Sequence, residues 1–545
     1  MVKLKHKIIL SSLLLSVFLL SGCDTKKEEG KQEVISTKTE TVNSTQNLPK
    51  ENKYLSAPIY GMTHFDPSQS DAFPYEVKTG DFNINLKNFP QVTGGPVNII
   101  TLNSTSENYM WGVSSQGVTY IDISNGQFTE AARKNGSGVR EISAKEHENV
   151  LRREYTDVAQ IEKAIKENYK VDFTRMYNGI YSVVDNENKV YATFGTNELN
   201  VFELVNKDDP KSGIKMAGSL DTSKFMQKGE RLTGLSMTYD GKLIIVGNSS
   251  VTVIDRDLKG EPQTVKFDAD EYITNSVAVD ENNGIYVASD KYMRKVVWNG
   301  SKLSADEKDG AWKSEYEIGE QPPTVKFGKG TGSTPTLMGF GSDEDKLVVI
   351  TDGADKMNIV AFWRDQIPEG FKQKAGTKSN RIADQFKITA GLPADTKWIQ
   401  TEQSVVVKGY GAFVVNNIVN EAPKDRLTGV IALGPVIAPP VGVERVKWNP
   451  KEDKWESVWS RGDVSSISMV PAVSTSSNIV FVNGYNKDSG WEVTGMDWDT
   501  GKTVHRTIFG KDNYGNGAYA IIQFFPNGDL LFNSISGPIR VNYTK

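Results

Sequence analysis

Short apolar segments separated by polar turns recur along the chain from about Asn83 onward. Two of them, residues 117–122 (GVTYID) and 251–255 (VTVID), alternate in side-chain character as half-buried β-strands do. Others, such as residues 243–246 (LIIV) and 347–350 (LVVI), are apolar throughout, as expected of strands that are covered on both faces. The pattern therefore predicts an all-β body in which most of each sheet is hidden from water.

The predicted strands come in repeated groups. Each group contains a strand, a polar turn, an apolar strand, a turn of small residues and another strand, and Asp–Gly or Asn–Gly pairs close several hairpins. Successive groups are roughly 40 to 65 residues apart, at and beyond the upper end of known propeller blade periods. The groups predict seven or eight blades, at residues 181–203, 235–255, 276–298 and 521–541, and more weakly at 109–123, 337–363, 405–432 and 468–498.

A single antiparallel group of this size cannot cover both of its own faces. Copies stacked around an axis cover one another and leave only short edges, so we expect a single β-propeller. The alternative is a pair of β-sandwich domains. It would require a linker near the middle of the chain, and residues 100–545 contain no low-complexity stretch.

Two segments need a separate interpretation. Residues 143–169 place apolar side chains among charged ones at helical spacing, which predicts a short helical insertion on a face of the propeller. The last group, at residues 521–541, lacks an outer strand. Residues 82–86 (FNINL) could supply it and would then join the two ends of the chain.

The N-terminal residues have the layout of an export signal. Lys3, Lys5 and Lys7 are followed by an apolar stretch at residues 8–20, which is short for a transmembrane helix. This stretch ends in Leu-Ser-Gly-Cys, with the cysteine at Cys23. The segment resembles the signal of bacterial lipoproteins, and the resemblance implies that Cys23 is lipidated and becomes the mature N-terminus.

These patterns divide the chain into four parts. We expect a signal peptide at residues 1–22 and a lipidated, disordered tether at residues 23–55, whose sequence is polar and mixes both charge signs. Residues 56–95 form an N-terminal capping segment with the possible closing strand. Residues 96–545 form the propeller.

Charge and cysteine content narrow the class of partner. The 545 residues include 63 Lys and Arg, 68 Asp and Glu, and one Cys. Without a basic excess, we expect no nucleic-acid partner. One cysteine cannot form an internal disulfide. Removal of residues 1–22 takes away lysines and no acid, so the mature chain is more acidic than the full chain. An anionic membrane surface repels an acidic chain. We therefore expect acyl chains, rather than the protein surface, to hold the mature chain at the membrane.

One repeat carries a family resemblance. Residues 497–502 (DWDTGK) are similar to the repeat of the quinoprotein-type (PQQ-like) β-propellers, although His505 stands where that family usually has a docking Trp. The resemblance implies a propeller and, in an enzyme, PQQ with Ca²⁺. The chain departs from the alcohol-dehydrogenase type because it has no Cys after Cys23. We interpret its acid-rich turns, at residues 280–283 and 343–345, as solvated hairpins.

The first candidate site precedes the propeller. His64, Asp66 and Asp71 supply an imidazole and two carboxylates within eight residues, a combination that can hold a metal or act as a general acid and base. A loop that caps one end of the ring would use the same side chains to satisfy backbone donors. Of the other mature histidines, we expect His147 to be exposed and His505 to have a packing or hydrogen-bonding role.

A second candidate site lies in the middle of the chain. The glycine-rich residues 328–341 offer free backbone N–H groups that could cradle an anion. Asp352 and Arg364 follow apolar strands of one blade, so they could face the central channel as a pair or form an ordinary structural ion pair. Clustered tryptophans, at residues 448, 455 and 459, could stack on sugars or fill the blades.

Two functions remain open. The first is a monomeric, lipid-anchored propeller on the extracytoplasmic face of the cell membrane that binds a protein or small-molecule ligand. The second is a propeller enzyme, a quinoprotein-like oxidoreductase or a hydrolase, with its site in the central channel. The sequence names no cofactor, and Ca²⁺ or PQQ is expected only for the enzyme. No complete catalytic set is visible, which favours the binding module.

Overall fold

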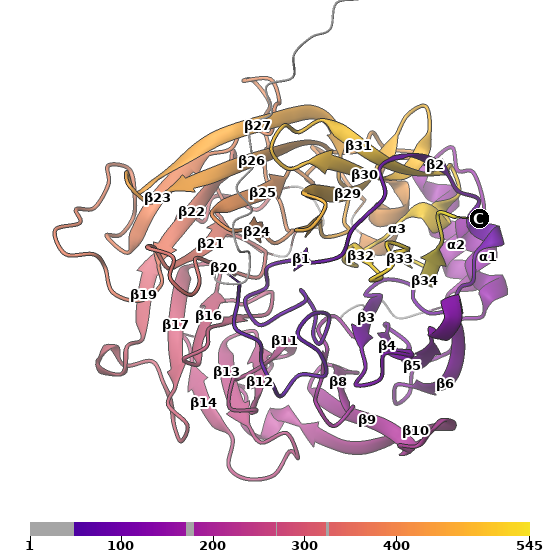
Figure 1. Cartoon of the computed structure of the whole chain (residues 1–545), viewed down its shortest axis with the longest axis horizontal. Coiled ribbons are helices and arrows are strands. Elements are labelled where there is room, and N and C mark those ends of the chain that lie inside the picture. The colour runs from indigo at the N-terminus through magenta and orange to yellow at the C-terminus, as the bar shows by residue number, and fades with distance from the viewer. Residues whose placement is uncertain are drawn as a thin grey trace, which may run out of the picture. The chain divides into compact units, whose positions relative to one another are not determined.

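Within the residues that it describes, the computed structural model contains eight mainly antiparallel sheets that follow one another along the chain (Figure 1). The structure describes residues 48–170, 179–268, 270–322, 326, 328–423 and 425–544. These residues belong to the unit Thr45–Lys545. The expected signal peptide, Cys23 and most of the expected tether lie outside the described residues and stay predictions.

In the first four sheets the strands are neighbours in sequence order. An extra strand, β19, pairs with β17 in the fourth sheet. These sheets contain β3 (Ile100–Asn103), β4 (Tyr109–Val113), β5 (Gly117–Asp122) and β6 (Thr129–Asn135); β7 (Val183–Val184), β8 (Val190–Thr193), β9 (Glu198–Asn206) and β10 (Asp209–Asp221); β11 (Leu232–Met237), β12 (Leu243–Gly247), β13 (Ser250–Ile254) and β14 (Gln263–Lys266); and β15 (Ala278–Val279), β16 (Gly284–Ala288), β17 (Tyr292–Trp298), β18 (Leu303–Ser304) and β19 (Trp312–Glu315).

The next four sheets repeat this arrangement, with two strands added in parallel from the N-terminal segment. They contain β20 (Thr336–Met338), β21 (Leu347–Thr351), β22 (Asn358–Trp363) and β23 (Ile382–Lys387); β24 (Val406–Lys408), β25 (Gly411–Val415), β26 (Val441–Asn449) and β27 (Lys454–Ser465); β28 (Ala472–Ser474), β29 (Ile479–Asn486), β30 (Gly490–Asp497) and β31 (Thr503–Gly510), flanked by β1 (Ala72–Phe73) and β2 (Gly80–Asn83); and β32 (Gln523–Phe524), β33 (Leu530–Ser534) and β34 (Gly537–Val541).

The apolar runs lie between sheets. In β12, Leu243 and Ile245 pack with the preceding sheet, whereas Ile244 and Val246 pack with the following one. Every neighbouring pair of sheets shares such an apolar layer, and the last layer joins the sheet β32–β34 to the sheet β3–β6. The sheets therefore close into a ring, and the fold is a β-propeller. The alternative of two β-sandwich domains is wrong.

Among the described residues, three α-helices interrupt the strands. The predicted helical insertion consists of α1 (Ala144–Leu151) and α2 (Val158–Asn168), and Ser143 caps α1 with Glu146 in a reciprocal capping box. A third helix, α3 (Arg426–Ala432), lies between β25 and β26, where the sequence predicts only strands and turns. The part of the chain that the structure describes also contains the 3-10 helices η1 (Leu86–Asn88), η2 (Ser124–Gly126), η4 (Thr222–Lys224), η5 (Glu307–Asp309) and η6 (Asn513–Gly515).

The N-terminal segment completes two sheets. The prediction that residues 82–86 supply the outer strand of the last sheet is wrong, because β2 pairs with β31 of the preceding sheet. Residues 90–94 lie beside β34 instead: Val92 N–H donates to Pro538 O at 3.1 Å, and Gly94 N–H donates to Ser536 O at 2.9 Å. Proline and glycine in this segment hide its strand character in the sequence.

His147 is buried, which corrects the expectation that it is exposed. It lies on the inner face of α1, its Nδ1 is 3.1 Å from the Tyr169 hydroxyl, and burial lowers its pKa to about 3. The apolar positions of the helix decide its place, because Val150 and Leu151 beside it are also fully buried.

This burial predicts a pH-dependent stability. The unfolded chain binds a proton at His147 below about pH 6.5, whereas the folded chain does not bind it until about pH 3, so stability falls as the pH drops through this window. We expect the wild type to lose about 2 kcal/mol more unfolding free energy than His147→Gln between pH 7 and pH 5. Urea unfolding at both pH values measures this, and an equal loss in the two proteins would contradict it.

Candidate functional site

Residues 52–73, called the plug below, cross the centre of the ring (Figure 1). The first strand of each sheet lies nearest this centre and is called the inner strand. The plug hydrogen-bonds the inner strand, or a residue directly beside it, in all eight sheets. The partners are Asn103, Ser182, Thr238, Val279, Leu337, Val407, Val473 and Phe524.

Most of these bonds are between backbone groups, with N···O distances such as 2.7 Å from Val279 to Pro67 and 2.9 Å from Val473 to Asp71. The plug follows a tightly wound path, because Tyr60, His64 and Phe65 adopt positive φ angles of 59°, 60° and 74°. Side chains other than glycine rarely take this conformation, and it persists only where many contacts hold it.

His64 and Asp71 form a buried pair within the plug. The imidazole Nδ1 is 2.8 Å from Asp71 Oδ2 and 3.0 Å from Oδ1. Burial raises the pKa of Asp71, and the His64 charge and hydrogen bond oppose that rise. With Nδ1 bonded to the carboxylate, the neutral imidazole keeps its free lone pair on Nε2. No residue in the described ranges hydrogen-bonds this Nε2.

Asp66 has a different task. Its carboxylate accepts hydrogen bonds from the Ser68 backbone N–H at 2.7 Å and from the hydroxyls of Ser68 and Ser70. Burial raises its pKa, while the serine hydrogen bonds lower it. Asp66 therefore satisfies donors of the plug itself, as the capping interpretation of this segment anticipates.

A cavity lies at the other end of the inner strands. The plug bonds mostly at or near their C-terminal ends. The cavity is lined instead by residues that lie two to four positions before these strands, including Tyr181, Asn275, Gln403 and Ser468. His64 and Thr63 form its floor. Its empty volume, open solvent included, is about 630 Å³.

Several polar groups of this cavity need hydrogen-bond partners. Glu402 Oε1 and Ser468 Oγ are buried and have none among the described residues. Burial raises the pKa of Glu402, and the charges of Arg426 and Lys326 oppose that rise. Tyr181, whose ring centre lies 6.0 Å from that of His64, uses its hydroxyl on Asn275 and Thr334 at 2.9 and 2.8 Å.

Sequence reasoning did not find the cavity residues outside the plug. Tyr181, Asn275 and Ser468 come from separate repeats, and each stands just before an inner strand. The signal was available in principle, because polar residues at that position of successive repeats converge on the axis of a propeller. No single repeat contains more than a fragment of the site.

Asp352 and Arg364 do not form a pair, so that expectation is wrong. Asp352 accepts bonds from the backbone N–H of Asn358 at 2.7 Å and its Nδ2 at 2.6 Å, and burial raises the pKa of Asp352 to about 6. Arg364 donates to Gly339 O at 2.5 Å, at the other end of the hairpin β21–β22. An antiparallel hairpin places residues that follow its two strands at opposite ends.

The other singled-out residues have packing roles. Trp448 is buried, donates to Asp345 Oδ2 at 2.7 Å and packs edge-to-face against Trp455. The imidazole of His505 lies 2.6 Å from Lys78 O and 2.8 Å from the Thr507 hydroxyl. Burial lowers the pKa of His505 to about 4.

The acid-rich turns are satisfied locally. Asp280 accepts bonds from the N–H groups of Asn282 and Gly284, both at 2.9 Å, and from the Tyr286 hydroxyl at 2.6 Å. In the ranges that the structure describes, no three His, Cys, Asp or Glu side chains meet as a metal site would require. The helices described there are also too short or too polar to cross a membrane.

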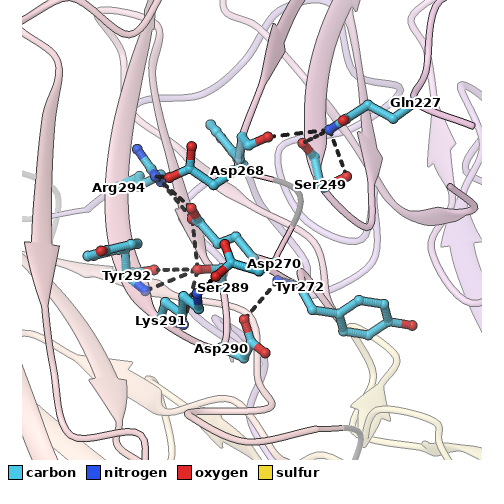
Figure 2. Close-up of polar contacts among 12 residues, drawn as sticks. Gln227, Ser249, Asp268, Asp270, Tyr272, Ser289, Asp290, Lys291, Tyr292 and Arg294 are labelled. Atoms are coloured by element: carbon cyan, nitrogen blue, oxygen red, sulfur yellow. Dashed lines mark hydrogen bonds and ion pairs between the residues drawn. The ribbon is translucent and has the colours of Figure 1, made fainter.

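Figure 2 shows a polar network between the sheets β11–β14 and β15–β19. Arg294 donates to both carboxylate oxygens of the buried Glu271, at 2.7 and 2.6 Å, and Ser289 bonds the same carboxylate. Lys291 pairs with Asp270 nearby. The network links the connection β14–β15 to the turn β16–β17. Because Glu271 and Asp270 already have cationic partners, these two acids offer no ligand site.

Comparison with known proteins identifies a relative. An uncharacterized protein of Archaeoglobus fulgidus is 32% identical over 375 residues, which cover 67% of this chain and 70% of that protein. The chain belongs to the family of this archaeal protein. No family model matches the chain.

Solved structures of low similarity were also found. A europium-containing methanol dehydrogenase is 10% identical with a TM-score of 0.45, covering 87% of this chain and 88% of its own. The β-propeller domain of Cps50 (Swd1) from Myceliophteria thermophila is 11% identical with a TM-score of 0.37, covering 65% and 91%. At these scores the function of this family has to be argued from its own side chains.

The His64–Asp71 pair predicts a strong coupling. Asp71→Asn removes the buried carboxylate that accepts the hydrogen bond from His64 Nδ1. Because an unsatisfied buried donor costs about 1–3 kcal/mol, we expect a loss of this size in unfolding free energy. The exposed pair Arg461–Asp463 is a matched control, and Asp463→Asn should cost about 1 kcal/mol or less. Urea unfolding measures both, and equal costs would contradict a buried, coupled pair.

Proposed function

We propose that this protein is a lipid-anchored propeller on the extracytoplasmic face of the membrane and that its central cavity binds a small molecule. The observation that carries the proposal is the arrangement of the channel. The plug occupies one end, and at the other end polar side chains from separate sheets line a cavity whose floor is His64. Concave sites with a few convergent polar groups are the usual form of a small-molecule site.

The position of the N-terminal residues supports the anchored arrangement. Asn52 donates to Thr238 O, and the Tyr239 hydroxyl donates to Lys50 O. The chain thus joins the propeller beside the turn β11–β12, on the face where the plug lies. A tether that starts at Cys23 would therefore join the propeller on this face.

A second candidate is an enzyme. A carboxylate that holds Nδ1 of a histidine orients the imidazole so that Nε2 can take a proton from a substrate. His64 has this partner in Asp71, at 2.8 Å, and lines the cavity. This pair is suited to acid–base chemistry such as hydrolysis.

The anchor is tested in cells. We expect Cys23→Ser to abolish incorporation of an alkyne-labelled fatty acid and to leave the unprocessed chain, because no other Cys is present to carry the lipid. Ser21→Ala is the control, since another small residue before the cysteine keeps the signal intact. Labelling that persists in Cys23→Ser would rule out the proposed anchor.

Binding in the cavity is tested with the purified full chain in detergent. A ligand that binds only the folded state raises stability by about 2.7 kcal/mol at a hundredfold excess over Kd, so a metabolite extract should raise the melting temperature. Ser404→Leu, in the cavity wall, should abolish this shift, whereas the same change at the exposed Ser301 should not. An equal shift in both variants would place binding elsewhere.

A further inference from the structure

We propose that the cavity takes a small uncharged molecule with several hydroxyl groups. The inference rests on the proposed binding function and names the class of ligand. It follows from three properties of the lining: which hydrogen-bonding groups lack partners, which charges are present, and how the apolar side chains are distributed.

The cavity groups that lack partners are mainly hydrogen-bond acceptors, so a matching ligand has to supply donors. His64 Nε2 in the neutral imidazole and Glu402 Oε1 are acceptors, and Ser468 Oγ can accept and donate. A buried polar group without a partner costs free energy, which a bound donor recovers. A polyol supplies O–H donors and also accepts from serine, so it can satisfy all three groups.

The charges around the cavity disfavour an ion. No Lys or Arg is among the described residues that line it, and the lining His64 already faces the Asp71 carboxylate, so a carboxylate or phosphate would gain little net attraction. Glu402 is the acid in the lining, and the positive charges of Arg426 and Lys326 nearby already compensate its negative charge. An ammonium group would therefore gain little net attraction. Burial of an ion without compensation is costly, which leaves a neutral ligand.

The walls are partly apolar. Ile100, Ile180, Val470 and Ile521 line the cavity beside the polar groups, and the Tyr181 ring lies at its floor near His64. A pyranose or cyclitol has the matching character, because its ring carries C–H faces that pack on such side chains and hydroxyls at its edge. A linear apolar molecule would leave the polar groups unsatisfied.

Saturation-transfer NMR and calorimetry on the full chain in detergent test the inference. The probes are neutral glucose, galactose, mannose and myo-inositol, with glucuronate and glucosamine as charged analogues of the same ring size. We expect at least one neutral probe to bind at least tenfold more tightly than both charged analogues. We expect Ser468→Ala to weaken that binding about tenfold.

Ser236→Ala is the matched control. Ser236 is also buried with an unpartnered Oγ, on the inner strand β11, but it does not line the cavity, so its loss should leave binding unchanged. Tighter binding of glucuronate or glucosamine at the same site would overturn the ligand class and leave the binding function standing. If no neutral probe binds while the extract still stabilises the protein through Ser404, the ligand class is wrong. If no neutral probe binds and the extract does not stabilise the protein either, the binding function itself fails.

Discussion

The structure depends on the fact that no sheet covers its own two faces. In β12, neighbouring apolar residues point in opposite directions, so Leu243 faces one sheet and Ile244 the next. Each sheet is therefore stable only between two others, and the series ends only when the last sheet meets the first. The layer formed by Val92, Met110, Phe525 and Leu531 makes that closure. The N-terminal segment takes part in this closure: residues 90–94 lie beside β34, and residues 52–73 cross the centre of the ring.

The plug turns this closure into a site. A ring of sheets leaves inner strands with backbone groups that face a narrow channel, and buried backbone groups need partners. Residues 52–73 supply them from one end. The cost is a strained path with positive φ at His64 and Asp71, among others, and strain of this kind is maintained where the surrounding contacts outweigh it. The same winding brings the two side chains together and puts the imidazole at the floor of the cavity.

The remaining half of the channel belongs to residues that no local motif marks. Glu402, Ser468 and Tyr181 are far apart in the sequence and meet because each lies two to four residues before an inner strand. The surroundings of these side chains suit them to a binding site: Oε1 of Glu402 is buried with no partner among the described residues, and Tyr181 lies beside His64.

The sequence by itself determined the class of fold. Strand-length apolar runs, turn residues and repeats are local properties, and together they require sheets that cover one another. It also determined that residues 64–71 hold an imidazole and two carboxylates. Only the tertiary structure decided what these residues do: Asp71 pairs with His64, Asp66 caps the plug, and Asp352 and Arg364 point to separate turns. It also decided that His147 is buried and that residues 90–94, rather than 82–86, edge the last sheet. These outcomes depend on contacts between segments that are far apart in the sequence. The hydrophobic pattern determines that a face is buried, but it does not determine which segment covers that face.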